Sequence, residues 1–103
     1  MPTYFIVRAT VTDSAKRAAF DKWYEQEHVP DAVKTFGAQK AWRFWSESDP
    51  AVHIAHYQFA DRAALDHGMR PENMQRLVAD FDKAWPHIKR SREIMTLAQE
   101  WEA

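Results

Sequence analysis

The sequence contains no cysteine and only two glycines. Without cysteine the chain has no disulfide, no thiolate nucleophile and no cysteine-ligated zinc or iron–sulfur cluster. Two glycines are also too few for the glycine-rich loop that wraps a phosphate group. These absences exclude several common kinds of catalytic and cofactor site.

The sequence also lacks an excess of charge and any long apolar run. Its 14 Lys and Arg residues oppose 15 Asp and Glu residues, for a formal net charge of −1. That balance is unlike the basic surface that neutralises nucleic-acid phosphates, so we expect no nucleic-acid partner. No apolar run approaches the ~20 residues of a membrane span, and the N-terminus lacks the basic start and cleavage site of a secretory signal. We therefore expect a cytoplasmic protein with no membrane partner.

What the chain has in quantity is aromatic side chains: five Trp, six Phe and three Tyr among 103 residues. A chain of this length predicts one domain, residues 1–103. A domain so small buries only about two thirds of the surface that its unfolded chain exposes. The apolar surface is large for that interior, so we expect part of it to contact a second subunit or a small-molecule ligand.

Hydrophobic periodicity and turn residues predict a ferredoxin-like fold of the α+β class. The strands are expected at Tyr4–Val11, Ala38–Glu47, Val52–Phe59 and Lys89–Gln99. The helices are expected from an Asp13 cap to about His28, where Pro30 ends the first, at Asp31–Phe36, at Arg62–His67, and from Pro71 to just before Pro86. This order is the split βαβ arrangement, with helices on one face of an antiparallel four-stranded sheet. A second sheet across a two-fold axis would cover the open face, so we expect a homodimer with a cleft between two sheets.

The most distinctive stretch is Phe20–Asp31, which reads FDKWYEQEHVPD. It combines an aromatic helix end, an acid–histidine pair and a proline that directs the chain out of the helix. His28 is therefore a candidate acid or base near neutral pH. The alternative is that His28 only caps the helix C-terminus, where the helix dipole favours a cation.

Trp23-Tyr24 followed by Glu27-His28-Val29-Pro30-Asp31 resembles the motif of the EthD-like branch of the dimeric α+β barrel superfamily. The resemblance implies a homodimer whose two sheets form a barrel with a central cleft, and His28 matches the histidine of the motif. The superfamily includes cofactor-independent monooxygenases, polyketide cyclases, lactone isomerases, haem-degrading enzymes and stress proteins. The role of the EthD branch in ether degradation is poorly defined, so the resemblance implies the architecture more strongly than an activity.

Side-chain alternation assigns residues of the expected strands to the cleft or to the helix layer. The cleft is expected to hold Tyr4, Ile6 and Arg8 from the first strand, Arg43 and Trp45 from the second, and Ile54, His56 and Gln58 from the third. The helix layer is expected to cover Phe5, Val7, Ala9, Trp42, Phe44, Ala55, Tyr57 and Phe59. In the fourth strand, Arg92 with Ile94 and Glu93 with Met95 are equally plausible pairs for the cleft.

His28, Arg8 and His56 are the expected catalytic residues. The arginine would stabilise an enolate or carboxylate while a histidine transfers the proton. Residues expected to bind the substrate, a flat and partly anionic molecule, are Tyr4, Ile6, Arg43, Trp45, Ile54 and Arg92. We then expect His28 to line an internal cavity that Arg8 or His56 also lines. The alternative is that the arginines pair with Glu47 or Glu93 and only line a dimer seam.

The histidines predict no metal site. His53 and His56 have an H-x-x-H spacing, but on a strand these two side chains point to opposite faces. Haem would need an axial histidine, which His28 or His56 could supply, and no other feature asks for it. We therefore expect no metal and no cofactor.

Two functions remain open from the sequence. The first is a small cofactor-independent enzyme that acts on an aromatic or polyketide-like molecule by acid–base chemistry. The second is a non-catalytic dimeric module that binds a ligand or serves in a stress response. The pairing of His28 with Arg8 favours the enzyme, since a binding module needs only apolar walls.

Overall fold

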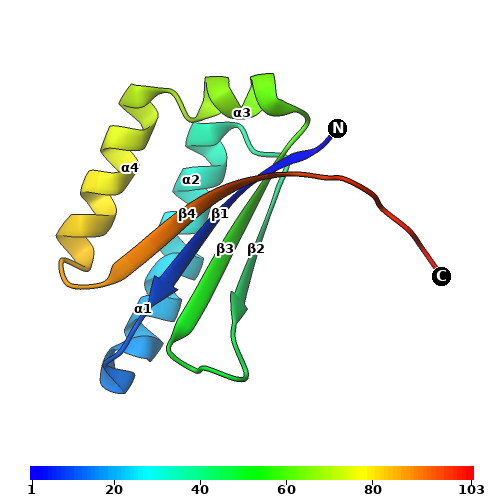
Figure 1. Cartoon of the computed structure of the whole chain (residues 1–103). Helices are drawn as coiled ribbons and strands as arrows, with labels where there is room; N and C mark the ends of the chain where they lie inside the picture. The colour runs from blue at the N-terminus through cyan, green and yellow to red at the C-terminus, as the bar shows by residue number, and fades with distance from the viewer.

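The secondary structure has the expected order of strand, helix, strand, strand, helix, strand (Figure 1). The computed structural model describes residues 1–103. The strands are β1 (Thr3–Thr10), β2 (Lys40–Trp45), β3 (Val52–Phe59) and β4 (Lys89–Thr96). The helices are α1 (Arg17–Trp23), α2 (Val29–Phe36), α3 (Arg62–Gly68) and α4 (Pro71–Ala84), with a 3₁₀ turn at Ser14–Lys16 and a π-helical turn at Tyr24–His28. No helix combines the length and the apolar character needed to cross a membrane.

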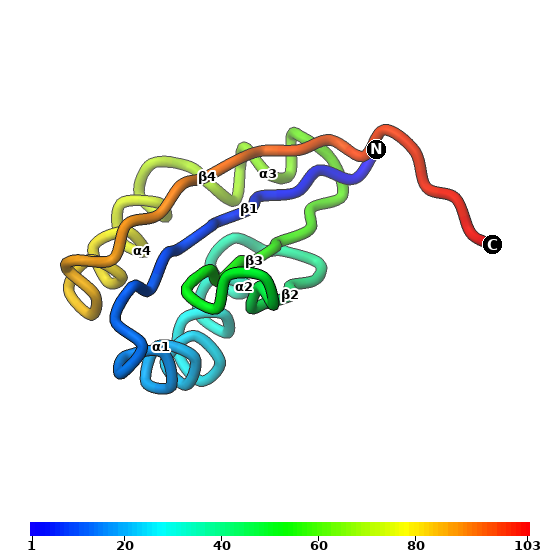
Figure 2. The backbone as a smooth tube through the Cα atoms, turned by 60° about the horizontal axis from the view of Figure 1, so that its bottom comes forward, coloured from blue at the N-terminus to red at the C-terminus, as the bar shows by residue number.

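The four strands form one antiparallel sheet in the order β2-β3-β1-β4. The helices lie on one face of this sheet, as predicted, and leave the other face open (Figures 1 and 2). In β1, Phe5, Val7 and Ala9 are buried under the helices, whereas Tyr4 and Ile6 are only partly covered on the open face.

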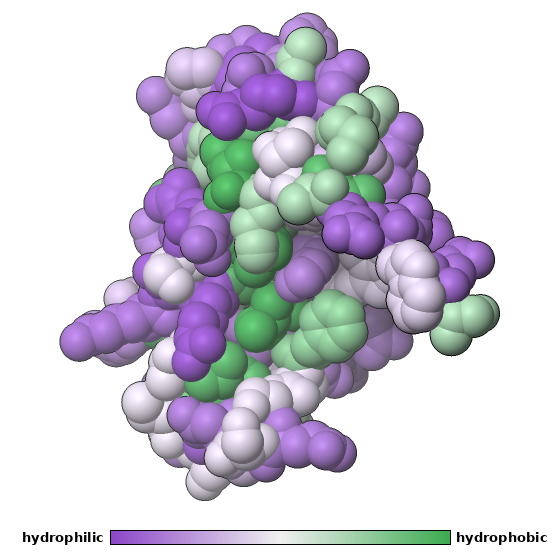
Figure 3. All heavy atoms as spheres, turned by 45° about the vertical axis from the view of Figure 1, so that its right-hand side comes forward, coloured by the Kyte–Doolittle hydropathy of each residue, from purple (hydrophilic) through white to green (hydrophobic).

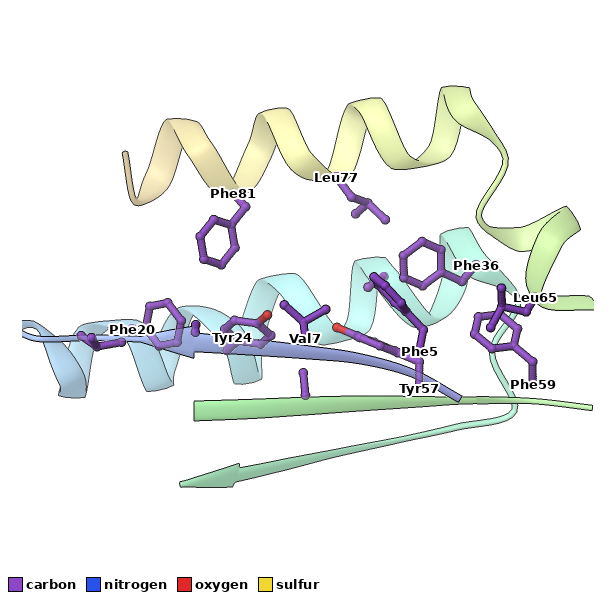
Figure 4. Packing of buried hydrophobic residues seen from close by; sticks show 14 residues of the cluster. Phe5, Val7, Phe20, Tyr24, Phe36, Tyr57, Phe59, Leu65, Leu77 and Phe81 are labelled. Atoms are coloured by element: carbon purple, nitrogen blue, oxygen red, sulfur yellow. The ribbon is translucent and has the colours of Figure 1, made fainter. Parts of the chain in front are cut away.

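The core lies between the sheet and the helices and is rich in aromatic rings (Figure 4). Phe5 and Val7 from the central strand meet Tyr57 from β3 and Phe81 from α4. These rings pack at centroid separations typical of aromatic pairs; Phe5 and Tyr57, for example, stack at 6.2 Å. Much of the aromatic content of the chain is therefore buried in this core.

The first helix does not stop near His28, which is a correction to the sequence prediction. The chain stays helical from Arg17 to Phe36, because a π-helical turn joins α1 to α2 and the N–H of Val29 donates to the carbonyl of Tyr24. Proline lacks an N–H and its ring crowds the carbonyl four residues back, so Pro30 would interrupt a regular α-helix. A wider turn just before the proline accommodates it. The helix ends as expected at Gly37, whose φ of 68° is left-handed.

The two faces of β2 are the reverse of those predicted. Arg43 lies directly opposite Ala55 in the β2–β3 register, so Arg43 and Trp45 are on the helix face. Trp42 and Phe44 are on the open face, where Phe44 is 49% exposed. Side-chain alternation alone could not show which face of β2 lies under the helices, because both faces carry large aromatic side chains.

Residues 97–103 extend away from the body of the molecule after β4, which ends earlier than predicted (Figures 1 and 2). A backbone hydrogen bond from Leu97 to Pro2 fixes the start of this arm. Trp101, near its end, is 81% exposed. The arm thus adds an uncovered aromatic ring at the edge of the molecule.

Candidate functional site

A pocket lies between the sheet and the helices, with α4 above it (Figure 4). Its volume is about 40 Å³, and nine of its twelve lining residues are hydrophobic. The other three are His28, Arg90 and Arg92, so no acidic side chain lines the pocket. An apolar hollow with a few polar groups directed into it is the usual form of a small-molecule site.

His28 reaches this pocket from the last position of the π-helical turn. Its ring stacks on Trp23 with 4.6 Å between centroids and meets Tyr24 and Phe81 edge-on. These rings remove water from the imidazole, and this burial lowers the pKa of His28 to about 4, although Asp31 opposes the shift. His28 is therefore neutral at pH 7 and able to accept a proton.

His28 also faces the outside. It lines a second hollow, on the surface between α2 and α4, together with Glu27, Asp31, Asp80 and Lys83. No protein hydrogen bond holds the ring in either hollow. The imidazole thus stands between the apolar pocket and the polar surface, where a proton accepted from inside can leave to solvent.

Tyr24, the first residue of the π-helical turn, and Tyr57 of β3 line the pocket, and each is only 1% exposed. Their hydroxyl oxygens point toward one another from either side of Val7 (Figure 4). Burial raises the pKa of Tyr24 and also raises the pKa of Tyr57, with a further contribution from the nearby Tyr24. Both phenols are therefore protonated at any physiological pH.

Helix α4 is held over the pocket by two ion pairs. Arg76 of α4 donates to both carboxylate oxygens of Asp31 on α2, at 2.9 and 3.0 Å. Arg90 of β4 lies 3.0 Å from Asp82 of α4, and its guanidinium sits 3.8 Å from the centroid of the Phe81 ring. Arg90 thereby ties the edge strand to the helix while still lining the pocket.

The sheet separates the predicted catalytic residues. His28 lines the pocket on the helix face, whereas Arg8 and His56 lie on the open face. The expectation that one cavity holds His28 with Arg8 or His56 is therefore wrong, and the arginines that line the pocket with His28 are Arg90 and Arg92. His28 does line a cavity, but it is the pocket under α4 and not the cleft between two sheets that was expected.

The predicted substrate-binding residues divide in the same way. Tyr4, Ile6 and Ile54 lie on the open face with Arg8 and His56. Arg92 faces the pocket, because it pairs with Val7 in the β1–β4 register. Neither Arg8 nor Arg92 forms an ion pair within the chain.

Arg43 and Trp45 lie on the helix face but do not reach the pocket, because Asp21 of α1 engages both. Asp21 Oδ1 accepts from Trp45 Nε1 at 2.8 Å and from Arg43 Nη2 at 3.0 Å. The Trp45 bond, with the Arg43 bonds and charge, holds the pKa of Asp21 below its usual value. These contacts fasten α1 to β2 and explain why Arg43 faces the helices.

His53 completes this network and is fully buried. Arg43 Nη1 donates to His53 Nε2 at 3.2 Å, which leaves the proton on Nδ1, where it has no partner. Burial, together with the charge of Arg43, lowers the pKa of His53 to about 4. His53 and His56 lie on opposite faces, as expected, and no three His, Asp or Glu side chains are placed to share a metal ion.

The open face has a hollow of its own, of about 510 Å³, lined by Arg8, His56, Ile6, Ile54 and residues of β4. Burial lowers the pKa of His56 there. Figure 3 shows a band of hydrophobic residues crossing this side of the molecule between polar margins. The hollow is larger than the pocket under α4, whose volume is about 40 Å³.

Sequence reasoning missed Tyr24, Tyr57 and Arg90 as pocket residues. Tyr57 had been assigned correctly to the helix side, but nothing in the strand shows that its hydroxyl ends in a cavity. Arg90 lies two residues before Arg92 on the same strand, so the two share a face, and this spacing could have indicated Arg90 as a pocket residue.

No protein-family model and no curated protein matches the chain. Solved structures do match. An ethyl tert-butyl ether d (EthD) family protein from Bacillus halodurans has a TM-score of 0.74 at 18% identity, covering 94% of this chain and 99% of that one. HapK from Hahella chejuensis has a TM-score of 0.68 at 18% identity, covering 100% and 99%. SnoaB, a cofactor-independent oxygenase from Streptomyces nogalater, has a TM-score of 0.71 at 12% identity, covering 96% and 95%.

The chain shares a ferredoxin-like α+β fold with these proteins. The likeness covers nearly the whole of each chain, so this ferredoxin-like fold accounts for residues from β1 to β4. At these identities the likeness concerns the fold alone, and function has to be argued from the pocket of this chain.

Proposed function

We propose that the protein is a small cofactor-independent enzyme of the EthD-like type that acts on an aromatic or polyketide-like molecule by acid–base chemistry. The observation that carries the proposal is His28: a neutral imidazole, free of protein hydrogen bonds, at the border of an apolar pocket. The likeness in fold to an EthD family protein and to a cofactor-independent oxygenase supports it.

The proposed step is a proton transfer from a C–H or O–H group of the bound ring to a nitrogen of His28. The electron pair left on the substrate forms an enolate or phenolate, and the imidazole becomes positively charged. Arg90 and Arg92 supply positive charge at the same pocket, which favours the anion. The proton can then pass through the outer hollow, because His28 lines both hollows.

The test uses 2-tetralone, a bicyclic ketone whose acidic C1–H exchanges with D₂O through its enolate. We expect the protein to accelerate this exchange, measured by NMR, and His28→Ala to lower the rate at least about tenfold. The control is His67→Ala, an exposed histidine on α3. Because the pKa of His28 is about 4, the wild-type rate should stay constant from pH 6 to 8 and fall as the pH drops through 4.

Other results would contradict this assignment. If His56→Ala abolishes exchange and His28→Ala does not, the reacting group is on the open face. If 2-tetralone binds without accelerated exchange, the second function, a non-catalytic binding module, replaces the enzyme.

The proposal includes a homodimer formed through the open face of the sheet. That face carries Phe44, 49% exposed, and Met95, 41% exposed, which lie opposite Ile54 and Tyr4 in the sheet. Helices cover only the opposite face, so the open face lacks a partner within the chain. A second copy of the same sheet would bury these side chains.

A further inference from the structure

The hydroxyl groups of Tyr24 and Tyr57 form no hydrogen bond within the protein and stay open to the pocket, because the fully buried polar atoms without a partner are His53 Nδ1 and Trp85 Nε1. Both side chains are almost fully buried, and both line the pocket under α4. A hydroxyl that opens into a pocket and has no partner in the protein is free to donate a hydrogen bond to a bound molecule. Here two such groups share one cavity and point toward one another (Figure 4).

The walls of the pocket are mostly hydrocarbon, and its other polar groups are His28, Arg90 and Arg92. Val7 lies between them, and the neighbouring pocket residues Phe5, Leu77 and Phe81 are hydrocarbon. Both phenols are held as O–H donors by burial, which disfavours their charged forms. The group that satisfies them is therefore a hydrogen-bond acceptor that comes with the ligand.

We propose that Tyr24 and Tyr57 together bind one oxygen atom of the ligand, which assigns the ligand to the class of flat ring compounds that carry a ketone, enol or phenol oxygen. This inference rests on the proposed function of the same pocket and adds the group by which the substrate is recognised. The cavity of about 40 Å³ has room for an oxygen and the few atoms around it, and His28 lines the same cavity.

The hydrogen bonds from Tyr24 and Tyr57 to the ligand oxygen also become stronger during the proposed reaction. Loss of a proton to His28 turns a ketone into an enolate and concentrates negative charge on that oxygen. Two donors aimed at the oxygen then make charge-assisted hydrogen bonds, which are stronger than those to the neutral ketone. Tyr24 and Tyr57 thus act as oxyanion donors, and His28 acts as the base.

The experiment removes the hydroxyls without changing the shape of the rings. Binding of 2-tetralone and of tetralin, the same bicycle without oxygen, is measured by ¹H–¹⁵N NMR titration. We expect the wild-type protein to bind 2-tetralone at least about tenfold more tightly than tetralin. Tyr24→Phe and Tyr57→Phe should each reduce that preference, and the double variant should abolish it. Tyr4→Phe, which alters the third tyrosine on the open face, is the matched control and should leave it unchanged.

A second measurement tests the unpartnered state of the hydroxyls. If they bind nothing in the free protein, Tyr24→Phe and Tyr57→Phe leave Tm unchanged or raise it, whereas a lower Tm reveals an internal partner and overturns the proposal. Equal affinity of the wild type for the two compounds, no binding of 2-tetralone at millimolar concentration, or a preference that survives the double variant also overturns it.

These outcomes separate the two proposals. Absence of C1–H exchange with the binding preference intact contradicts the enzymatic function and supports the oxygen-binding pair. Exchange that depends on His28 without the preference supports the enzyme and contradicts the pair.

Discussion

The imidazole of His28 is shielded from water on one side by Trp23 and approached edge-on by Tyr24 and Phe81. The same rings that lower its pKa also fix its orientation, because no hydrogen bond does so. A base positioned by aromatic packing can change its hydrogen-bond partner during a reaction without breaking a contact within the protein. This freedom suits a group that must receive a proton and then release it.

The low pKa values of His28 and His53 predict how stability depends on pH. Each pKa is about 4 in the folded protein and about 6.5 in the unfolded chain, so between these values only the unfolded state takes up the protons. The free energy of unfolding should be constant above pH 6.5 and fall as the pH drops from about 6.5 to about 4. Urea titrations at pH 7 and pH 4.5 measure the loss.

The control for this prediction is His28→Asn, which should lose less stability over the same interval. The carboxyls of Asp21 and Asp31, whose pKa values are lowered by their partners, act in a separate window below about 3.8. Equal stability of the wild type at pH 7 and 4.5 would contradict the burial of these histidines.

At the scale of elements, the junction of α2 and α3 depends on Gly68. A methyl group there would collide with the carbonyl oxygen of Phe36 and lie 3.1 Å from the ring of Phe59. Because the obstacle is backbone, the two helices would have to move apart. We expect Gly68→Ala to lower the free energy of unfolding by about 1–3 kcal/mol, measured by chemical denaturation.

A substitution at Gly37, the other glycine, serves as the comparison for Gly68→Ala. Gly37 has open space around it but a φ of 68°, so Gly37→Ala should cost about 1 kcal/mol through backbone strain alone. Gly37→Asn should cost less, since asparagine tolerates this conformation. An equally mild effect of Gly68→Asn would contradict the close approach of α2 and α3, because a larger side chain there meets the same carbonyl.

The elements themselves could be predicted from the sequence because their signals are local. Caps at Asp13 and Asp61 and the glycine after α2 mark helix ends, and alternation marks β1 and β3. The orientation of β2 could not be predicted, because it depends on Asp21, more than twenty positions away from Arg43. The π-helical turn could not be predicted either, because Pro30 indicates that the α-helix is interrupted but does not show whether the helix ends or only widens there.

The site was predictable only in part for the same reason. His28 stands out in the sequence because aromatic residues and a proline surround it. Its neighbours in the pocket come from β3, α4 and β4, and their meeting depends on packing between distant segments. Several residues that were expected to lie beside His28 are therefore on the opposite face of the sheet.

At the scale of the whole molecule, the open face predicts self-association. We expect sedimentation at micromolar concentration to give a dimer, and Phe44→Lys combined with Ile54→Lys to give a folded monomer, because two charges would be buried without partners. Ala63→Lys, an exposed position on α3, is the control and should stay dimeric. A wild-type monomer at these concentrations rules out the proposed barrel of two sheets.

The π-helical turn rotates α2 about the helix axis relative to α1, so the two halves of the long helix direct their side chains differently. An α-helix advances by about 100° per residue, so one extra residue rotates everything beyond it by that amount. Before the turn, Asp21 meets β2; after it, Asp31 meets α4. Deleting one residue between Tyr24 and His28 would put the two halves back in phase and force the helix to give up one of these attachments. The length of this segment, and not only its composition, is therefore under structural constraint.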